Sequence, residues 1–396
     1  MPRYEVYATR YDSLGIVDEL VPARDLTFSL PLNDHGECTF TATVEPGKSF
    51  WRAALALPFA GVLVSRDGVP VWEGLVIEER PSGPRSFQFT AREWGWFFEE
   101  KVPAVPRRWI KANDHLIFRQ LISDAQAISG QNLLIELGST LGATVSDRAV
   151  AAWDKTTVGR EFRSVADAEG GPEWYIQSGG TLDAPRRQLI LGDRLGQTDP
   201  QMVLEYVEDT ERYQAPDAPP IVTLLGDLFP GVAPEVPTRR AGGNVIAQGR
   251  SRTLAEAATV AIATGSGEEA AQLRSTATAS NLLTLGWPRM TSFSDYSDVS
   301  VKTTLNRHAS ADLKAVAGIA TAYSLVTLDG DPTADWSQTP RGSSVRVVLD
   351  TDVYGGDRPV GGADGFTARC INTLVRVPDS GSAQIEWQVD ETLEGS

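Results

Sequence analysis

The fold is decided by residues 60–79, which read AGVLVSRDGVPVWEGLVIEE. Two apolar, β-branched runs, 60–65 and 69–78, are separated by Arg66-Asp67-Gly68. Asp-Gly between two such runs is a strong hairpin signal, because both residues tolerate the positive φ angles of a tight turn. The sequence therefore predicts two antiparallel strands joined by a short turn.

Strand patterns continue on both sides of this hairpin. Further short runs alternate in polarity or are rich in β-branched residues, and turn residues separate them: 5–9, 25–30, 37–44 and 86–91. Many short strands joined by turns are typical of a small barrel or sandwich. We therefore predict a first β-barrel domain over residues 1–105.

The next region changes to a helical pattern. Asn113 or Asp114 can cap a helix that runs to Ser129, and a second, shorter helix begins at Thr156 or Thr157. The apolar side chains of the first helix share one face, which predicts packing on a core: Leu116, Ile117, Leu121, Ile122, Ala125 and Ile128. The second helix is followed by a predicted hairpin of strands 173–177 and 188–191. We predict an α+β inserted domain over residues 106–200.

The C-terminal half returns to strand patterns after a segment rich in Pro, Asp and Ala, 201–240, which reads as a linker. We expect a second β-barrel domain that is interrupted by an insertion. Its parts are a first section 241–302, a helix-containing insertion 303–343 with the helix at 303–317, and closing strands within 344–396. The predicted fold class is mainly β with α+β insertions, containing two small β-barrels.

Composition excludes several classes of function. The chain has 396 residues, enough for several domains, and a net charge of −16. Such an acidic chain repels the phosphates of nucleic acids and of anionic membranes. Two distant cysteines, Cys38 and Cys370, cannot build a disulfide framework or a Cys-based zinc site. With no signal peptide or membrane-spanning run, we expect a soluble protein made in the cytosol without a membrane anchor.

One glycine-rich segment matches the loose dinucleotide-binding pattern. Gly265-Ser266-Gly267 follows an apolar strand, but Glu268 and Glu269 come next. Two carboxylates would stand where a pyrophosphate must bind, so repulsion argues against the site. We predict a surface turn and no cofactor.

Three groups of acidic residues raise the question of a metal or a catalytic dyad. Asp329, Asp331 and Asp335 lie close in sequence, but the complete calcium-loop pattern is missing, so we predict a turn with capping aspartates. Adjacent acids at Glu78-Glu79 and Glu99-Glu100 would point to opposite faces of a strand and form no facing pair. Only three histidines occur, without metal-ligand spacing. We predict no metal site, no catalytic residue and no enzymatic activity.

The aromatic run Trp94-Gly95-Trp96-Phe97-Phe98 could stack sugars or bases, or it could close a barrel or form an interface. Glu93, Glu99 and Glu100 flank it, so it lacks the cations that nucleic acids require. The candidate packing or interface residues are Trp72, Trp94, Trp96, Phe97 and Phe98.

Three stretches together resemble the tail-hub, or baseplate-hub, proteins of long-tailed bacteriophages, especially the minor tail proteins of actinobacterial siphophages. The first joins WEGLVI at 72–77 to FQFTAREWGWFF at 87–98. The second is TVGREF at 157–162, which continues to GGPEWY at 170–175. The third runs from NRHA at 306–309 to SVRVV at 344–348 and the closing VPDSG at 377–381.

The resemblance implies a structural component of the virion, located at the tail tip. Hubs of this family carry two similar barrels per chain and form homotrimers, whose six barrels adapt a sixfold tail tube to threefold tip parts. The implied partners are further copies of the chain, the distal tail protein, the tape-measure protein and other tail-tip proteins. DNA would pass through the bore during ejection without specific binding, and acidic walls would suit that passage.

Two other classes of function stay open on the sequence. The first is a tail-associated cell-wall hydrolase, which needs facing carboxylates or a metal. The second is a carbohydrate- or receptor-binding tip protein, which needs exposed tryptophans on a concave face.

Overall fold

A computed structural model describes most of the chain. The described residues are 2–44, 50–55, 60–103, 105–150, 156–168, 170–200, 202–205, 243–253, 257–267, 272–297, 299–317, 320–349 and 365–391. Most of the predicted linker 201–240 lies outside these ranges.

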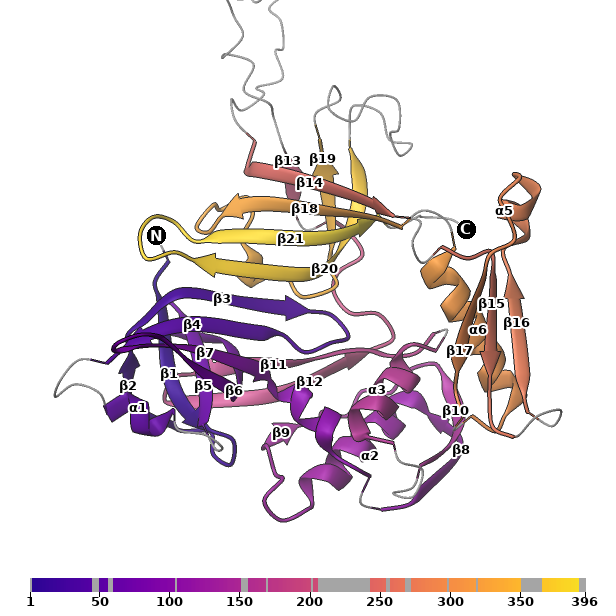
Figure 1. The fold of residues 1–396 in the computed structure, drawn as a ribbon, viewed down its shortest axis with the longest axis horizontal. Helices are drawn as coiled ribbons and strands as arrows, with labels where there is room; N and C mark the ends of the chain where they lie inside the picture. Colours follow the sequence, from indigo (N-terminus) through magenta and orange to yellow (C-terminus); the bar gives the residue numbers. More distant parts are fainter. Residues whose placement is uncertain are drawn as a thin grey trace, which may run out of the picture.

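Residues from both ends of the chain build one large sheet (Figure 1). The N-terminal part contributes seven strands and the short helix α1 (Phe50–Ala54): β1 (Tyr4–Arg10), β2 (Ile16–Val21), β3 (Ala23–Pro31), β4 (Glu37–Thr43), β5 (Ala60–Arg66), β6 (Val69–Gly83) and β7 (Ser86–Glu93). The hairpin predicted from Asp67-Gly68 is confirmed as β5–β6, and both turn residues have positive φ angles.

The C-terminal part contributes the remaining strands of this sheet: β13 (Val203–Glu205), β14 (Val245–Thr253), β18 (Ala320–Leu328), β19 (Ser344–Val348), β20 (Phe366–Val377) and β21 (Gln384–Glu391). The two parts meet where β20 pairs with β3, with Leu374 opposite Ser29. The first residues of β20 pair with β19 and the later ones with β3, so β20 joins the C-terminal part of the sheet to the N-terminal part.

The structure confirms a mainly β chain with α+β insertions. The two small β-barrels that we predicted are not found, because no closed barrel forms among the described strands. The hydrogen-bonded order is the open path β14-β18-β21-β20-β3-β4-β7-β6-β5-β1-β2. The two strand-rich parts join across β20 and β3, and one continuous hydrophobic core runs beneath both.

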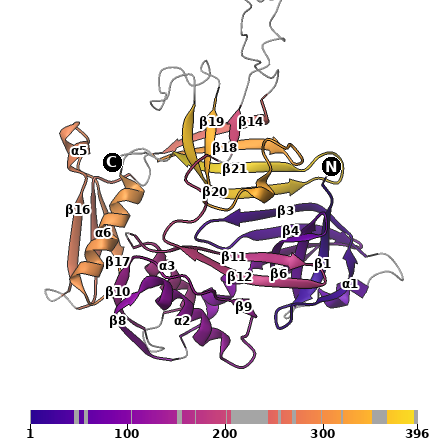
Figure 2. The same cartoon turned by 180° about the vertical axis from the view of Figure 1, so that it is seen from behind.

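The first insertion follows β7 and lies against the N-terminal part. It contains η1 (Trp94–Glu100), β8 (Arg107–Asn113), α2 (Asp114–Gln126), β9 (Ile135–Glu136), β10 (Val145–Val150), α3 (Val158–Ala166), β11 (Glu173–Thr181) and β12 (Ala184–Gly192). Seen from behind, the β11–β12 hairpin runs across β6 (Figure 2).

The second insertion lies at the far end of the molecule, beyond β8 and β10 (Figure 1). It contains β15 (Val260–Thr264), β16 (Arg274–Thr278), α5 (Ser280–Thr284), β17 (Thr291–Asp295) and α6 (Lys302–Val316). Its chain leaves after β14 and returns at β18, which pair with each other, and the Ala258 amide donates to the Val316 carbonyl at its base. We expected strands 241–302 to lie in a barrel, but β15–β17 form their own sheet on α6 because the apolar face of that helix covers them.

The predicted helices and late strands all form, with small shifts of their ends. Asn113 accepts a hydrogen bond from the His115 amide as the cap of α2, and Thr157 caps α3 in the same way. The predicted core face of α2 is wrong at Leu116, which is 45% exposed because the core covers a narrower stripe. We did not predict β2, β8, β9, β10 and β13, or the short helices α1 and α5.

Candidate functional site

The aromatic residues singled out in the sequence divide into buried and half-buried groups. Trp94 and Phe98, on η1, are completely buried, whereas Trp96 and Phe97 are half-buried. Trp72, on β6, is completely buried in the main core. Trp94 and Trp96 therefore do not form the exposed concave face that sugar stacking requires.

Aromatic rings pack against one another between η1 and the helices of the first insertion. The Phe98 ring lies 5.4 Å from that of Phe162, which stacks on Phe118 at 4.4 Å. The Trp174 ring lies 5.5 Å from Phe118. These rings bury a large apolar area and fix the insertion against the end of the main sheet.

A fully buried ion pair joins β12 of the insertion to β6 of the main sheet. The Arg187 guanidinium donates to both carboxylate oxygens of Glu73, at 2.6 and 3.0 Å, and both side chains are at most 1% exposed. The guanidinium also lies 4.0 Å from the centre of the Trp94 ring. Its remaining donors reach four backbone carbonyls: Arg10, Tyr11, Ser13 and Leu133. Every charge in this contact is thus compensated, as burial demands.

A second buried pair joins the N-terminal part to the segment before β19. Arg341 donates to Glu93 at 2.7 Å and to the Pro31 carbonyl at 3.0 Å. The second Glu93 oxygen accepts from the Gly36 amide at 2.7 Å. The Arg341 guanidinium lies 4.7 Å from the centre of the Tyr175 ring. One arginine therefore contacts both main-sheet parts and the β11 strand.

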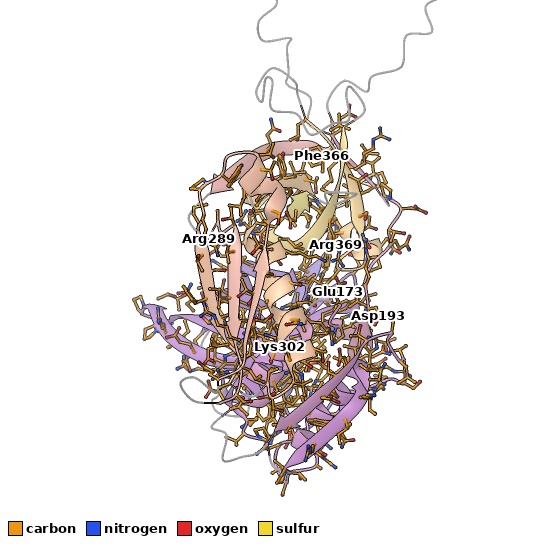
Figure 3. All side chains as sticks on the ribbon, turned by 90° about the vertical axis from the view of Figure 1, so that its right-hand side faces the viewer. Glu173, Asp193, Arg289, Lys302, Phe366 and Arg369 are labelled. Carbon is orange, nitrogen blue, oxygen red and sulfur yellow. The ribbon has the colours of Figure 1, made fainter. Side chains whose placement is uncertain are left out.

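A third pair joins β20 to β11 (Figure 3). Arg369 donates to Glu173 from both terminal nitrogens, the longer contact measuring 2.6 Å. The Leu195 amide donates to the same carboxylate. The first and third pairs thus bind the β11–β12 hairpin to the N-terminal and C-terminal halves of the large sheet, and Arg341 of the second pair contacts the hairpin through the Tyr175 ring.

The acidic cluster considered for calcium is occupied by protein groups. Asp329 is 5% exposed and accepts from both Arg66 and the Tyr4 hydroxyl, at 2.8 and 2.6 Å. Burial and this carboxylate raise the pKa of Tyr4. Asp331 and Asp335 accept backbone amides two residues ahead, which confirms the predicted capping turn. No group of three metal-ligating side chains occurs in the described ranges.

The two insertions contact each other through polar side chains. Arg307 of α6 donates to Asp114 at 3.2 Å and to the Ser146 hydroxyl at 2.9 Å. Arg148 of β10 lies 3.2 Å from Nε2 of His308 and donates to the Ser164 hydroxyl. These contacts are hydrogen bonds and ion pairs, so they depend on the geometry of polar groups.

His308 is the titratable group at the centre of that interface. It is fully buried, and its ring stacks on Tyr296 at 4.0 Å. Burial, then the charges of Arg148 and Arg307, lower the pKa of His308 to about 3. The imidazole is therefore neutral at neutral pH, with Nε2 free to accept from Arg148.

The acid pairs considered for catalysis are engaged in ordinary ion pairs on the surface: Glu78 with Arg80, Glu79 with Arg52, and Glu99 with Arg163. In the glycine-rich segment, the Gly265 and Ser266 amides donate to the Leu273 and Val299 carbonyls. A pyrophosphate would need those donors. Glu268 and Glu269 lie outside the described residues.

The sequence reasoning missed the ion pairs that join the parts. Glu73 stands inside an apolar strand, and Arg187 occupies one of the buried positions of β12, which alternate with exposed ones. Both ion-pair residues stand at positions that the strand pattern assigns to the core. A buried charge requires a partner, so this position was a signal that an ion pair forms there.

Comparison with solved structures finds the same fold over nearly the whole chain. The tail protein from Neisseria meningitidis MC58 matches with a TM-score of 0.55 and 11% identity, covering 98% of this chain and 97% of that one. The 43 kDa tail protein of prophage MuSo2 from Shewanella oneidensis also gives 0.55, with 9% identity and 98% of each chain covered.

A prophage tail protein from Listeria monocytogenes EGD-e matches with a TM-score of 0.50 and 9% identity, covering 98% of this chain and 95% of that chain. No protein-family model matches the sequence, and no curated protein matches it. None of the described helices is long and apolar enough to cross a membrane.

Proposed function

We propose that this chain is a structural component of a bacteriophage tail, a hub at the tail tip. The observation that carries the proposal is the end-to-end likeness of fold to proteins described as tail proteins, with coverage of 95% or more on both sides. Because 98% of this chain is covered, the likeness extends to both insertions.

The hub would be a ring of three copies that adapts a sixfold tube to threefold parts. The open path of the large sheet supports such assembly. Among the described strands neither β2 nor β14, at its two ends, has a second strand partner. Unpaired edges are available for contact with copies of the same chain. Within each copy, we retain the limits 1–105 and 106–200 of the first two domains as a proposal.

The neighbours in this proposal are the distal tail protein, the tape-measure protein and other tail-tip proteins. The half-buried Trp96 and Phe97 offer aromatic area for such contacts. DNA would pass through the ring without specific binding, and the net charge of −16 is consistent with walls that repel phosphate.

A structural role without catalysis is supported by the state of the charged groups. The buried carboxylates of Glu73, Glu93 and Asp329 are all held by arginines. The oxygens of these carboxylates already accept hydrogen bonds from protein donors, so they are not free to contact a substrate.

The proposal is tested by locating the chain in intact tails by electron cryomicroscopy, with mass photometry of the purified chain beside it. We expect three copies around the tail axis at the tip. A position outside the tail would overturn the proposal. Release of sugars or peptides from purified cell walls, abolished by one Asp or Glu substitution, would favour the hydrolase instead.

A further inference from the structure

A groove of about 670 Å³ lies between three segments that are distant in sequence. Its walls come from the β5–β6 hairpin at 66–71, from β11 at 175–180 and from the turn 336–341. The volume is within the range of ligand-binding clefts. The contacts described above do not account for this groove.

One side of the groove is formed by β11, and the direction of its backbone groups follows from the register of the β11–β12 hairpin. Thr181 pairs with Ala184 across a two-residue turn, so these two exchange backbone hydrogen bonds. Hydrogen-bonded pairs alternate along an antiparallel ladder. The N–H and C=O groups of Gly179, Gln177 and Tyr175 therefore point to β12. Those of the alternate residues point to the opposite edge of β11: Trp174, Ile176, Ser178 and Gly180.

The start of that opposite edge is already used as a strand edge. The Trp174 carbonyl accepts from the Asn33 amide at 2.9 Å, and the Trp174 amide donates to the Asn33 side chain at 2.8 Å. Further along, Ile176, Ser178 and Gly180 have no backbone partner on this side among the described residues. Their donors and acceptors repeat every two residues, about 6.6 Å apart, which is the spacing of an extended chain.

The charged residues around the groove determine which side chains a bound extended segment can carry. Arg66 and Arg341 are held by the carboxylates behind them, and their side chains are only 13% and 11% exposed. Asp67 lines the groove and stays exposed, and Val69 beside it is 54% exposed and offers an apolar contact. These surroundings favour uncharged or basic side chains and disfavour acidic ones.

We propose that the free edge of β11 binds an extended segment of a different protein, which adds a strand along Ile176, Ser178 and Gly180 and fills the groove. The segment is uncharged or basic and alternates small or β-branched side chains toward Val69. Main-chain hydrogen bonds supply affinity, and the groove walls supply specificity. This inference goes beyond the tail role and does not depend on it.

Gly179 provides a way to block the groove without disturbing the fold. A Cβ atom at Gly179 meets nothing within 4 Å, and its φ angle lies outside the left-handed region. Gly179→Val therefore puts a β-branched side chain into the open groove at a strand position that favours it. Gly15 has equally open surroundings and no positive φ, and it does not line the groove, so Gly15→Val is the matched control.

The experiment selects binders for the full chain from a random peptide library and measures the dissociation constants of the selected peptides. We expect peptides rich in Thr, Val and Lys. Their dissociation constants should rise at least about tenfold for Gly179→Val and stay unchanged for Gly15→Val. Amide exchange should slow at Ile176, Ser178 and Gly180 on binding, while Gln177, already bonded to β12, stays the same. Selection of no peptide, equal binding by both variants, or protection elsewhere would overturn the proposal.

Discussion

The two insertions of this chain are held in place by different physical means. The first packs a continuous set of aromatic rings, among them Phe118 and Phe162, against the end of the main sheet and contains the buried Arg187. The second has a core of small and aliphatic residues: Ala263, Val299, Leu305 and Ala309. The first is therefore part of the main structure, whereas the second is a small unit attached by polar contacts.

This difference indicates how the chain should respond to damage. Loss of buried apolar area or of a buried charge partner destabilises everything that shares the core. A contact built from hydrogen bonds between separate cores can open while each core stays folded. The following predictions test whether the two insertions behave so differently.

The largest effect is expected for Arg187→Met. It leaves the Glu73 carboxylate buried without its partner, and we expect the free energy of unfolding to fall by about 3–5 kcal/mol. Urea unfolding followed by tryptophan fluorescence measures it. The double variant Glu73→Leu with Arg187→Met should recover part of the loss, since no charge is then left unpaired, although four backbone carbonyls still lack the donors of Arg187. A double variant no more stable than the single one would contradict this account.

Truncation of one core residue in each insertion compares the two directly. Phe162→Ala should lower the stability of the whole chain by about 3–5 kcal/mol, because it opens a cavity among the stacked rings. Leu305→Ala should cost about 2–5 kcal/mol, confined to the second insertion. Amide exchange in β15 and α6 reports the second effect, with β6 and β11 as internal controls. Equal loss of protection in all four elements would show that the insertions unfold together.

Acidification should weaken the contact between the insertions. The pKa of His308 is lowered to about 3 from a value near 6.5 in the unfolded chain. Between these values the unfolded chain binds more protons, so stability is complete above pH 6.5 and falls as the pH drops toward 3, by at most about 1.4 kcal/mol per pH unit. His308→Gln, which cannot be protonated, should give a flatter profile of α6 amide protection against pH. An unchanged profile would exclude His308 as the cause.

The smallest effect is expected for Arg163→Met in the first insertion. Its pair with Glu99 is well formed, but the arginine side chain is 49% exposed. Exposed pairs are weak, so the loss should be about 0–1 kcal/mol, measured by the same urea titration as Arg187→Met. A loss of stability as large as that of Arg187→Met would mean that burial does not determine how much each ion pair contributes.

The sequence was a good guide to individual elements. The Asp67-Gly68 turn, the caps Asn113 and Thr157 and the turn at Asp331 and Asp335 all form as predicted. Each depends on a few neighbouring residues whose side chains or φ angles act locally. Of the candidate packing residues, the sequence pattern could identify the aromatic type but not the difference between the buried Trp94 and the half-buried Trp96.

Local sequence patterns do not allow a prediction of which residues pair with the charged residues of the core. Glu73 and Arg187 are separated by more than a hundred residues, and nothing local to either shows that they meet. The same holds for Glu93 with Arg341 and for the Arg66 contact to Asp329.

The sequence was enough to predict a mainly β chain, the starts of α2, α3 and α6, and several tight turns, because alternation, capping and turn chemistry act over a few residues. The tertiary structure was needed to learn that β20 joins the two strand-rich parts through β3 and that β15–β17 form a separate sheet. It also shows that β11 has only β12 as a strand partner among the described residues. Strand pairing depends on the packing of whole faces against one another, and many pairings satisfy the same local pattern.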